Sequence, residues 1–372
     1  MIKDKVRNIL HRKKWYIILH IVNRGDMKKF LLFVLLSFAI TAVAYSQGKV
    51  AVYSVAFYNL ENLFDTIDQP DVLDEEFTPS GSYRWGALKY RNKINNLAYV
   101  LSKLGTDKFC PQGPAVIGVS ELENRGVLKD LIAADALAGR NYGIVHFDSP
   151  DRRGVDVALL YDKNQFVVDT AISVRLHLKC APDVLTRDQL LVSGRLAGER
   201  VHFIVNHWPS RWGGEEASSP RREEAAALSR HLADSVLAAD PNSKVIIMGD
   251  LNDDPYNKSV SEVIGAVKTQ DEVKPGGYFN AMWELYDRGI GTLAYNGTWN
   301  LFDQMLLSAN LIGKDRSSLK YFKTEIFNKD FLCQKTGKYK GYPLRTHAQG
   351  RYLNGYSDHF PVIIYLAKRV SE

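Results

Sequence analysis

The amino-acid sequence predicts an α/β sandwich, in which two mixed β-sheets carry helices on their outer faces. Three observations predict this fold class. Short apolar runs rich in β-branched and aromatic residues recur along the chain and are typical of buried strands. Helical patterns separate only some of these runs, and short turns such as residues 196–200 join others, which favours mixed sheets. No repeat or Pro/Gly/Ser-rich linker interrupts residues 47–372, so this segment is predicted to be a single domain.

Seven apolar runs are the predicted strands. Each is short, and polar or turn residues follow most of them, as expected for strands that cross a buried sheet. They span residues 52–58, 115–120, 156–161, 200–206, 245–249, 302–308 and 361–367.

Two helices are predicted between the strands. The second begins at Ser219–Pro220, because proline suits a first helical turn, and ends at Asp240–Pro241. The first is indicated by apolar residues at helical spacing before the stop residue Gly105. These residues are Ile94, Leu97, Ala98, Leu101 and Leu104.

Composition places the chain among soluble globular proteins. It is 45% hydrophobic and 24% charged, which excludes a disordered protein. The formal net charge is +6, but residues 1–29 alone hold nine Lys or Arg and two Asp. The rest of the chain is therefore close to neutral, which argues against strong non-specific DNA binding through overall charge.

A secretory signal peptide is predicted over residues 27–46. Two lysines follow Met27, an apolar run extends from Phe30 to Val43, and small residues stand at Ala42 and Ala44. Residues 1–26 are then an upstream read-through, and the protein is exported to the periplasm or beyond. A membrane anchor that includes residues 15–22 is the alternative, although the apolar run is short for a bilayer span.

Three cysteines, Cys110, Cys180 and Cys333, limit the redox and metal chemistry. Their odd number and the absence of a Cys-x-x-Cys pair exclude a thiolate zinc site and a dense disulfide framework. A single disulfide remains open, with partners that spacing does not decide.

Four predicted strands end in acids, amides or an imidazole. They deliver Asn59, Glu121, His207 and Asp250, and Asn252 follows closely. Each ending alone fits ordinary turn chemistry. Together they predict a site at one rim of the sheets. Oxygen ligands suit Mg²⁺, and histidine supplies an adjustable proton, so this set matches the hydrolysis of a phosphate ester.

The adjacent pair Asp358 and His359 precedes the last predicted strand. Adjacent residues of an extended chain face opposite ways, so both can serve one site only if the chain turns there. The alternative is an ordinary strand start with a surface histidine.

Seven motifs now give the chain a family resemblance. In order they are FYNLENLF, GVSELEN, RGVDVALLY, VNHWPSR, GDLNDDP, LFDQMLLS and GYSDHFPV, and they cover nearly all of residues 50–368. The chain resembles the endonuclease/exonuclease/phosphatase superfamily of DNase I-like enzymes. The resemblance implies a four-layer α/β sandwich with two central mixed β-sheets.

The resemblance also implies roles for individual residues. Asn59, Glu121 and Asp358 would bind Mg²⁺, with Mn²⁺ as a substitute. Among the implied catalytic residues, His207 contacts phosphate, Asp250 orients the attacking water and Asn252 holds a phosphoryl oxygen. Asp303 orients His359, which is the second histidine of the pair.

Several positions depart from the family pattern or stay open. Ser120 stands where the family commonly has Gln or Glu. Glu61 and Glu123 are extra acids that are either metal ligands or partners of nearby cations. Arg153 and Asp156 either bind phosphate or form a salt bridge at the start of a strand.

The segment 328–356 favours a nucleic-acid substrate, because basic residues alternate there with tyrosines. Lys338, Lys340 and Arg345, together with Arg211, are predicted to contact the substrate, and the alternative is a solvated loop. We expect an endonuclease acting on DNA or RNA, monomeric and without a stable protein partner. The alternatives are a phosphatase or sphingomyelinase-like phosphodiesterase acting on small or lipid phosphates, and a non-catalytic binding module.

Overall fold

The computed structural model describes residues 49–106 and 109–370. Residues Ala51–Lys368 form one compact unit, and the rest of the chain is grouped in a second. Of that second unit, only residues 49–50 and 369–370 are described. The predicted upstream segment (1–26) and signal peptide (27–46) lie outside the described residues. No helix in the described ranges has the length and apolar character needed to cross a membrane.

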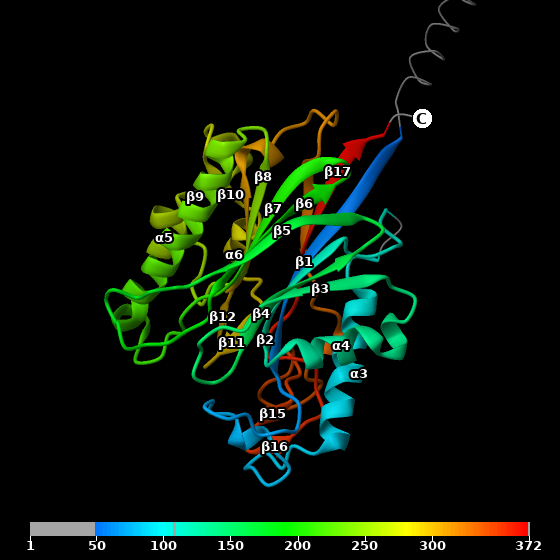
Figure 1. Ribbon diagram of the computed structural model, residues 1–372, viewed down its shortest axis with the longest axis vertical. Helices are drawn as coiled ribbons and strands as arrows, with labels where there is room; N and C mark the ends of the chain where they lie inside the picture. Colours follow the sequence, from blue (N-terminus) through cyan, green and yellow to red (C-terminus); the bar gives the residue numbers. More distant parts are fainter. Residues whose placement is uncertain (1–48, 107–108, 371–372) are drawn as a thin grey trace, which may run out of the picture. The chain divides into compact units, whose positions relative to one another are not determined.

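Two large mixed sheets form the centre of the unit Ala51–Lys368 (Figure 1). Within the described residues, the first sheet has six strands and the second has seven. In spatial order the first contains β14 (Lys320–Ile326), β17 (Val362–Arg369), β1 (Val50–Leu63), β2 (Val116–Leu122), β4 (Asp156–Asp162) and β3 (Tyr142–His146). The second contains β5 (Phe166–Val174), β6 (Gln189–Leu196), β7 (Glu199–His207), β8 (Lys244–Asp250), β13 (Asp303–Ser308), β10 (Tyr278–Asn280) and β9 (Ala266–Val267).

Both sheets combine parallel and antiparallel pairs, as the sequence predicts. β1 runs parallel to β2, and β2 runs antiparallel to β4. In the second sheet β7 and β8 are parallel, whereas β8 and β13 are antiparallel. Two short hairpins complete the strands. They are β11 (Leu293–Tyr295) with β12 (Thr298–Asn300), and β15 (His347–Ala348) with β16 (Arg351–Tyr352).

Helices cover the outer faces of the two sheets. α3 (Ala87–Lys103) and α4 (Arg125–Ala133) lie beside the first sheet, and α5 (Glu215–Ala239) packs on β7 and β8 of the second (Figure 1). The remaining short helices are α6 (Trp283–Asp287), η1 (Glu75–Phe77), η2 (Asp135–Leu137), η3 (Ser259–Ile264), η4 (Gln270–Glu272), η5 (Ala309–Leu311) and η6 (Asp330–Leu332).

The prediction that α5 begins at Ser219–Pro220 is wrong, because the helix starts four residues earlier, at Glu215. Gly213 and Gly214 adopt positive φ angles of 87° and 110°, which bring the chain sharply into the helix. Pro220 has no N–H to offer the first turn. The first turn also has a side-chain donor, because the guanidinium of Arg222 donates a hydrogen bond of 2.9 Å to the carbonyl oxygen of Glu215.

Alternation along β8 explains the layering. Ile246 and Met248 join the core cluster that contains residues of the first sheet, whereas Val245 and Ile247 join the cluster that contains residues of α5. A strand buried on both faces lies between two apolar layers. The two sheets approach closely, since a Cβ atom on Gly118 of β2 would lie 3.0 Å from Cε of Met248. The predicted α/β sandwich is confirmed.

The three cysteines, all within the described residues, form no disulfide with one another. Cys180 and Cys333 are free thiols. Cys110 is buried, and its Sγ lies 3.3 Å from Oγ of Ser54.

Candidate active site

Three neighbouring strands of the second sheet bring His207, Asp250 and Asp303 side by side. His207 is paired with Asp250 in the parallel register of β7 and β8, and Asp303 is paired with Asp250 across β8 and β13. All three residues are buried. The strand register alone thus assembles three of the predicted catalytic residues.

Asn59 links the two sheets at this rim. Its Nδ2 donates a hydrogen bond of 3.0 Å to Oδ2 of Asp250, and both side chains are buried. Its Oδ1 accepts a hydrogen bond of 2.8 Å from the backbone N–H of Glu61. The first strand of one sheet is thereby fixed against the central strand of the other.

Glu121 lies at an irregularity in the pairing of β2. The register shifts between Ser120 and Leu122, and Glu121 has a φ of +57°, in the left-handed region. Such backbone is uncommon for a residue with a Cβ atom and clusters at functional sites. The Oε1 atom of Glu121 consequently lies 3.7 Å from Nε2 of His207.

Two imidazoles face the same carboxylate oxygen. Oδ2 of Asp250 lies 3.7 Å from Nε2 of His207 and 3.9 Å from Nε2 of His359. Both separations are too long for direct hydrogen bonds. The three groups therefore face one another without forming hydrogen bonds among themselves.

The two histidines have opposite protonation preferences. Burial, assisted by the charges of Arg187 and Arg153, lowers the pKa of His207 well below its ordinary value. Burial also acts to lower the pKa of His359, but the carboxylates of Asp303 and Asp250 outweigh it and raise that pKa well above its ordinary value. At neutral pH His207 is neutral and His359 is protonated.

A turn before β17 presents His359 to the site. The Oγ atom of Ser357 accepts a hydrogen bond of 3.1 Å from the N–H of His359 and donates one of 2.7 Å to the carbonyl of Asn59. Nδ1 of His359 then donates to Oδ2 of Asp303 over 2.7 Å. The chain bends at Asp358 and His359, which is the condition for both side chains to serve one site.

Asp358 and Glu61 are two further acids of the candidate site. Oδ2 of Asp358 accepts a hydrogen bond of 2.6 Å from Arg345, and Nε of Arg345 lies 3.3 Å from Oε1 of Glu61. Burial and the charge of Glu61 raise the pKa of Asp358 to about 6, and Glu121 adds to the rise. These carboxylates are close enough to repel one another, and a divalent cation would relieve that repulsion. The donors are all oxygen atoms, so the set fits a hard cation such as Mg²⁺.

Lys93 is a buried cation that sequence reasoning missed. Its Nζ lies 3.3 Å from Oε2 of Glu61 and donates to Oγ1 of Thr346 and to the carbonyl of Tyr356, at 2.7 Å each. Burial lowers the pKa of Lys93. A signal was present, because the lysine precedes Ile94 on the apolar face of the predicted helix.

Arg187 was also missed, and it supports the end of β7. Its guanidinium donates to the carbonyls of His207 (3.1 Å) and Trp208 (2.6 Å) and pairs with Asp151 at 3.0 Å. The backbone of Arg153 donates to the same carboxylate, at 2.9 Å. No sequence pattern identifies this role, because two of the partners are backbone carbonyls.

The predicted substrate-binding cations differ in their surroundings. Arg153 lies at the rim, half exposed, and donates to Oδ1 of Asn62 at 2.6 Å. Lys338 and Lys340 are exposed. Arg345 is paired with acids, as described above. Arg211 is paired with Glu215, Asp253 and Asp254, which favours a structural role for its charge.

Asn252 follows Asp250 with a φ of +51°. Its N–H donates to Oδ1 of Asp250 and its Nδ2 donates to the carbonyl of Trp208, each at 3.0 Å. These bonds hold Asn252 at the rim, next to the strand end that carries Asp250.

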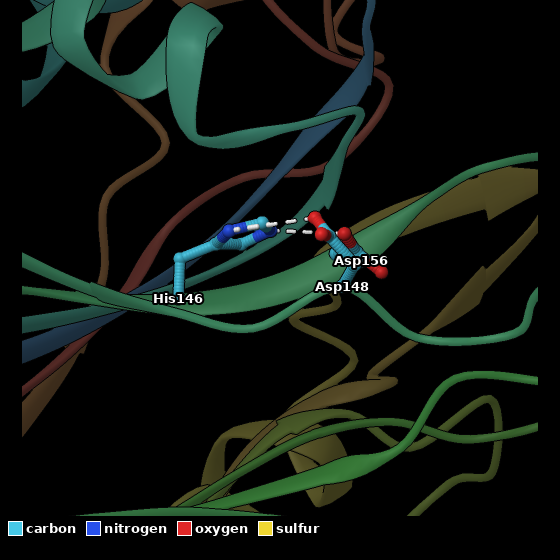
Figure 2. Close-up of side chains that lie close together, drawn as sticks. All are labelled: His146, Asp148 and Asp156. Carbon is cyan, nitrogen blue, oxygen red and sulfur yellow. Dashed lines mark hydrogen bonds and ion pairs between the residues drawn. The ribbon is translucent and has the colours of Figure 1, made fainter. Parts of the chain in front are cut away.

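Glu123 and Asp156 form hydrogen bonds with groups other than the candidate catalytic residues. Glu123 accepts a hydrogen bond of 2.6 Å from the N–H of Asp65, and burial raises its pKa to about 7. Asp156 lies 2.9 Å from Nε2 of His146, and Figure 2 shows the two side chains facing each other. Asp148 completes a group of three potential metal ligands, but its carboxylate is almost fully exposed and lies 3.9 Å from the ring. The geometry favours a structural pairing of β3 with β4 over phosphate binding by Asp156.

The sandwich and the converging acids and imidazoles define the phosphoesterase fold of the DNase I type. The model of the endonuclease/exonuclease/phosphatase family matches residues 54–368, and the chain belongs to this family. No curated protein matches the sequence significantly.

Solved structures with similar folds share little sequence with the chain. TDP2 from D. rerio, complexed with a single-strand DNA product, is 14% identical with a TM-score of 0.51, covering 85% of this chain and 98% of its own. A mannosyl-6-phosphatase from Bacteroides thetaiotaomicron is 17% identical with a TM-score of 0.50, covering 84% and 99%. Another family protein from B. thetaiotaomicron is 16% identical with a TM-score of 0.50, covering 87% and 100%. These likenesses show the fold and leave the substrate open.

Proposed function

We propose that the protein is a magnesium-dependent phosphodiesterase that cleaves DNA or RNA by in-line attack of water. The observation that carries the proposal is the position of Asp250, whose Oδ2 faces a neutral and a protonated imidazole at 3.7 and 3.9 Å. This arrangement combines a base with two N–H donors around one small space. Hydrolysis of a phosphate ester requires those groups together.

Asp250 is the group that accepts a proton from the attacking water. Burial raises its pKa to about 6, so it is a stronger base than an ordinary aspartate and is still ionised at neutral pH. The hydrogen bond from Asn59 fixes the orientation of its carboxylate. A positioned base with a pKa near the working pH is efficient at proton transfer.

The two histidines stabilise the charge that develops on the phosphoryl oxygens. His359 carries a proton on each ring nitrogen, and Asp303 occupies Nδ1, so Nε2–H is left for the substrate. We assign the proton of the neutral His207 ring to Nε2, because both groups that face this atom are carboxylates. Donors fixed before the reaction lower the barrier without reorganising during it.

Glu121, with Asp358 and Asn59 nearby, would hold the metal ion. A bound Mg²⁺ would supply Lewis-acid stabilisation of the phosphoryl and leaving oxygens. The Arg345 guanidinium, paired with Asp358, limits the excess negative charge beside that position.

The surface beside the site supports a nucleic-acid substrate. Lys335, Lys338 and Lys340 are exposed, and Tyr339 lies among them. Cations bind phosphates and tyrosine faces stack on bases. We further propose that the protein acts as a monomer outside the cytoplasm, after removal of residues 27–46.

A second candidate is a phosphatase or phosphodiesterase acting on small or lipid phosphates. The near-neutral charge of the chain beyond residue 29 favours it, since overall charge does not attract polyanions. The mannosyl-6-phosphatase among the similar structures supports the same alternative.

A substrate panel tests the proposal. The chain from residue 47 would be incubated with Mg²⁺ or Mn²⁺ and supercoiled plasmid, RNA, sphingomyelin, inositol phosphates or mannose 6-phosphate, with His207→Ala as the inactive control. We expect cleavage of plasmid or RNA by the wild-type protein only. Hydrolysis of small or lipid phosphates without nucleic-acid cleavage would support the second candidate instead.

A further inference from the structure

A cavity of about 210 Å³ opens beside the candidate active site. Asp358, the neighbour of His359, and its partner Arg345 form part of the wall. The β11–β12 hairpin contributes Tyr295, and the segment before β15 contributes Tyr339 and Tyr342. The cavity therefore joins the catalytic turn to two separate surface segments.

Three tyrosines, Tyr295, Tyr339 and Tyr342, line the cavity. Tyr295 is 70% exposed and Tyr339 is 36% exposed. The ring of Tyr342 lies between other aromatic rings, 5.7 Å from Tyr339 and 5.4 Å from Trp299. A tyrosine face left open at a cavity offers a large, rigid contact area to a ligand.

Aromatic contacts fix this wall to the catalytic turn. Trp299, which contacts Tyr342, also stacks on Phe360 with ring centroids 6.0 Å apart and planes 18° apart. Phe360 directly follows His359. A ligand held by the tyrosines would thus lie at a fixed distance from the imidazole that acts on phosphate.

The polar part of the wall suits a neutral group. Arg345 and Asp358 are the charged residues of the lining, and they pair with each other at 2.6 Å. Asn296, Gln334 and Gln349, which carry side-chain amides, also line the cavity. Amides donate and accept hydrogen bonds, as the edges of heterocyclic bases do.

We propose that this cavity binds one nucleobase of the substrate, adjacent to the scissile phosphate. The inference rests on the proposed function, because it places the base next to a phosphate held by His207 and His359. The volume lies below the roughly 300–1,000 Å³ of cavities that enclose drug-sized ligands, so it holds one ring system and not a longer stretch of chain. Stacking on tyrosine would make the preference among bases weak.

Paired oligonucleotides test the inference. Single-stranded hexanucleotides would carry one cleavable phosphodiester flanked either by bases or by abasic tetrahydrofuran residues. We expect the wild-type KM to be roughly tenfold lower for the base-bearing strand, in the range of one stacked base. Tyr295→Ala with Tyr339→Ala should remove this difference, whereas Tyr295→Phe, which keeps the ring, should preserve it. Phe322→Ala, another exposed ring outside the cavity, is the matched control.

Binding separates this inference from the proposed function. The anisotropy of labelled hexanucleotides on the His207→Ala variant measures base-dependent affinity without turnover. If the base-dependent difference in affinity disappears in the tyrosine variant, the inference is supported. Failure of the wild-type protein to cleave either strand would contradict only the proposed function. Cleavage with the same base preference in wild type and tyrosine variant would overturn the inference and leave the proposed function intact. A tyrosine-dependent KM for mannose 6-phosphate, without base dependence on the oligonucleotides, would also overturn it.

Discussion

Nδ1 of His359 lies 2.7 Å from Oδ2 of Asp303, although 56 residues separate them in the chain. Asp303 is fully buried beside Asp250 in the second sheet, and His359 enters from the turn that precedes β17 in the first. The pair is therefore a contact between the two sheets. It gives His359 a pKa well above its ordinary value, against the opposing effect of burial.

Replacing Asp303 with Asn should lower kcat by on the order of 100-fold, the scale of losing one donor that stabilises charge in the transition state. The substitution removes a carboxylate that raises the pKa of His359, so that pKa falls. If protonated His359 is the active form, the alkaline limb of the kcat profile moves to lower pH, because the proton is lost earlier as the pH rises. The measurement is kcat against pH for both proteins, with thermal unfolding as a check on folding. An alkaline limb at the same pH in both would exclude His359 as the group that sets it.

The sequence predicted the strands that carry the site better than it predicted the supporting residues. All seven predicted runs are strands, and the strand register places His207, Asp250 and Asp303 side by side at the strand ends. Periodicity and residue type are local properties, and they suffice for this.

Residues that act through the backbone were not predictable in the same way. Arg187 binds two carbonyls, and carbonyls carry no sequence identity. Arg211 is predicted to bind substrate from its place after His207, and that place does not reveal its pairing with Asp253 and Asp254 from another strand end. The start of α5 was misplaced because Pro220 was assigned to the first turn, whereas the helix starts at Glu215, after two glycines with positive φ.

Arg187→Lys should reduce kcat roughly tenfold with little change in KM. A lysine keeps the charge but cannot donate to both carbonyls and Asp151, so His207 would no longer be held in its position, and small displacements at a reacting centre are costly. We expect the free energy of unfolding to fall by about 1–3 kcal/mol, because buried acceptors are left without donors.

The matched control for this change is Arg175→Lys. Arg175 pairs with Asp188 at 2.9 Å and is half exposed, so its replacement should change stability by less than about 1 kcal/mol. Steady-state kinetics and urea unfolding measure both variants. Equal kinetics for Arg187→Lys and Arg175→Lys would contradict the positioning role.

Removal of divalent metal should abolish hydrolysis and lower the thermal unfolding midpoint. A ligand that binds only the folded chain at 100 times its Kd stabilises it by about 2.7 kcal/mol. Addition of Mg²⁺ after EDTA should restore activity and the midpoint. Glu121→Gln should abolish the Mg²⁺-dependent shift, whereas Glu123→Gln should keep it, since Glu123 is held by Asp65. Hydrolysis that persists unchanged in EDTA would refute the metal requirement.

Lys338→Gln with Lys340→Gln should weaken DNA binding and flatten its salt dependence. Both lysines are exposed and close in sequence to the tyrosines of the cavity. Counterions are released when a lysine binds a phosphate. For single-stranded DNA, the slope of log K against log salt should therefore become shallower by about 0.7 for each lysine–phosphate contact that is lost. Arg345 is left unchanged, because its guanidinium is already paired with Asp358 and Glu61.

The matched control replaces two exposed lysines elsewhere, Lys163→Gln with Lys274→Gln. This double variant lowers the net charge equally and should leave the slope nearly unchanged. Equal slopes for the two double variants would assign segment 328–356 a structural role only.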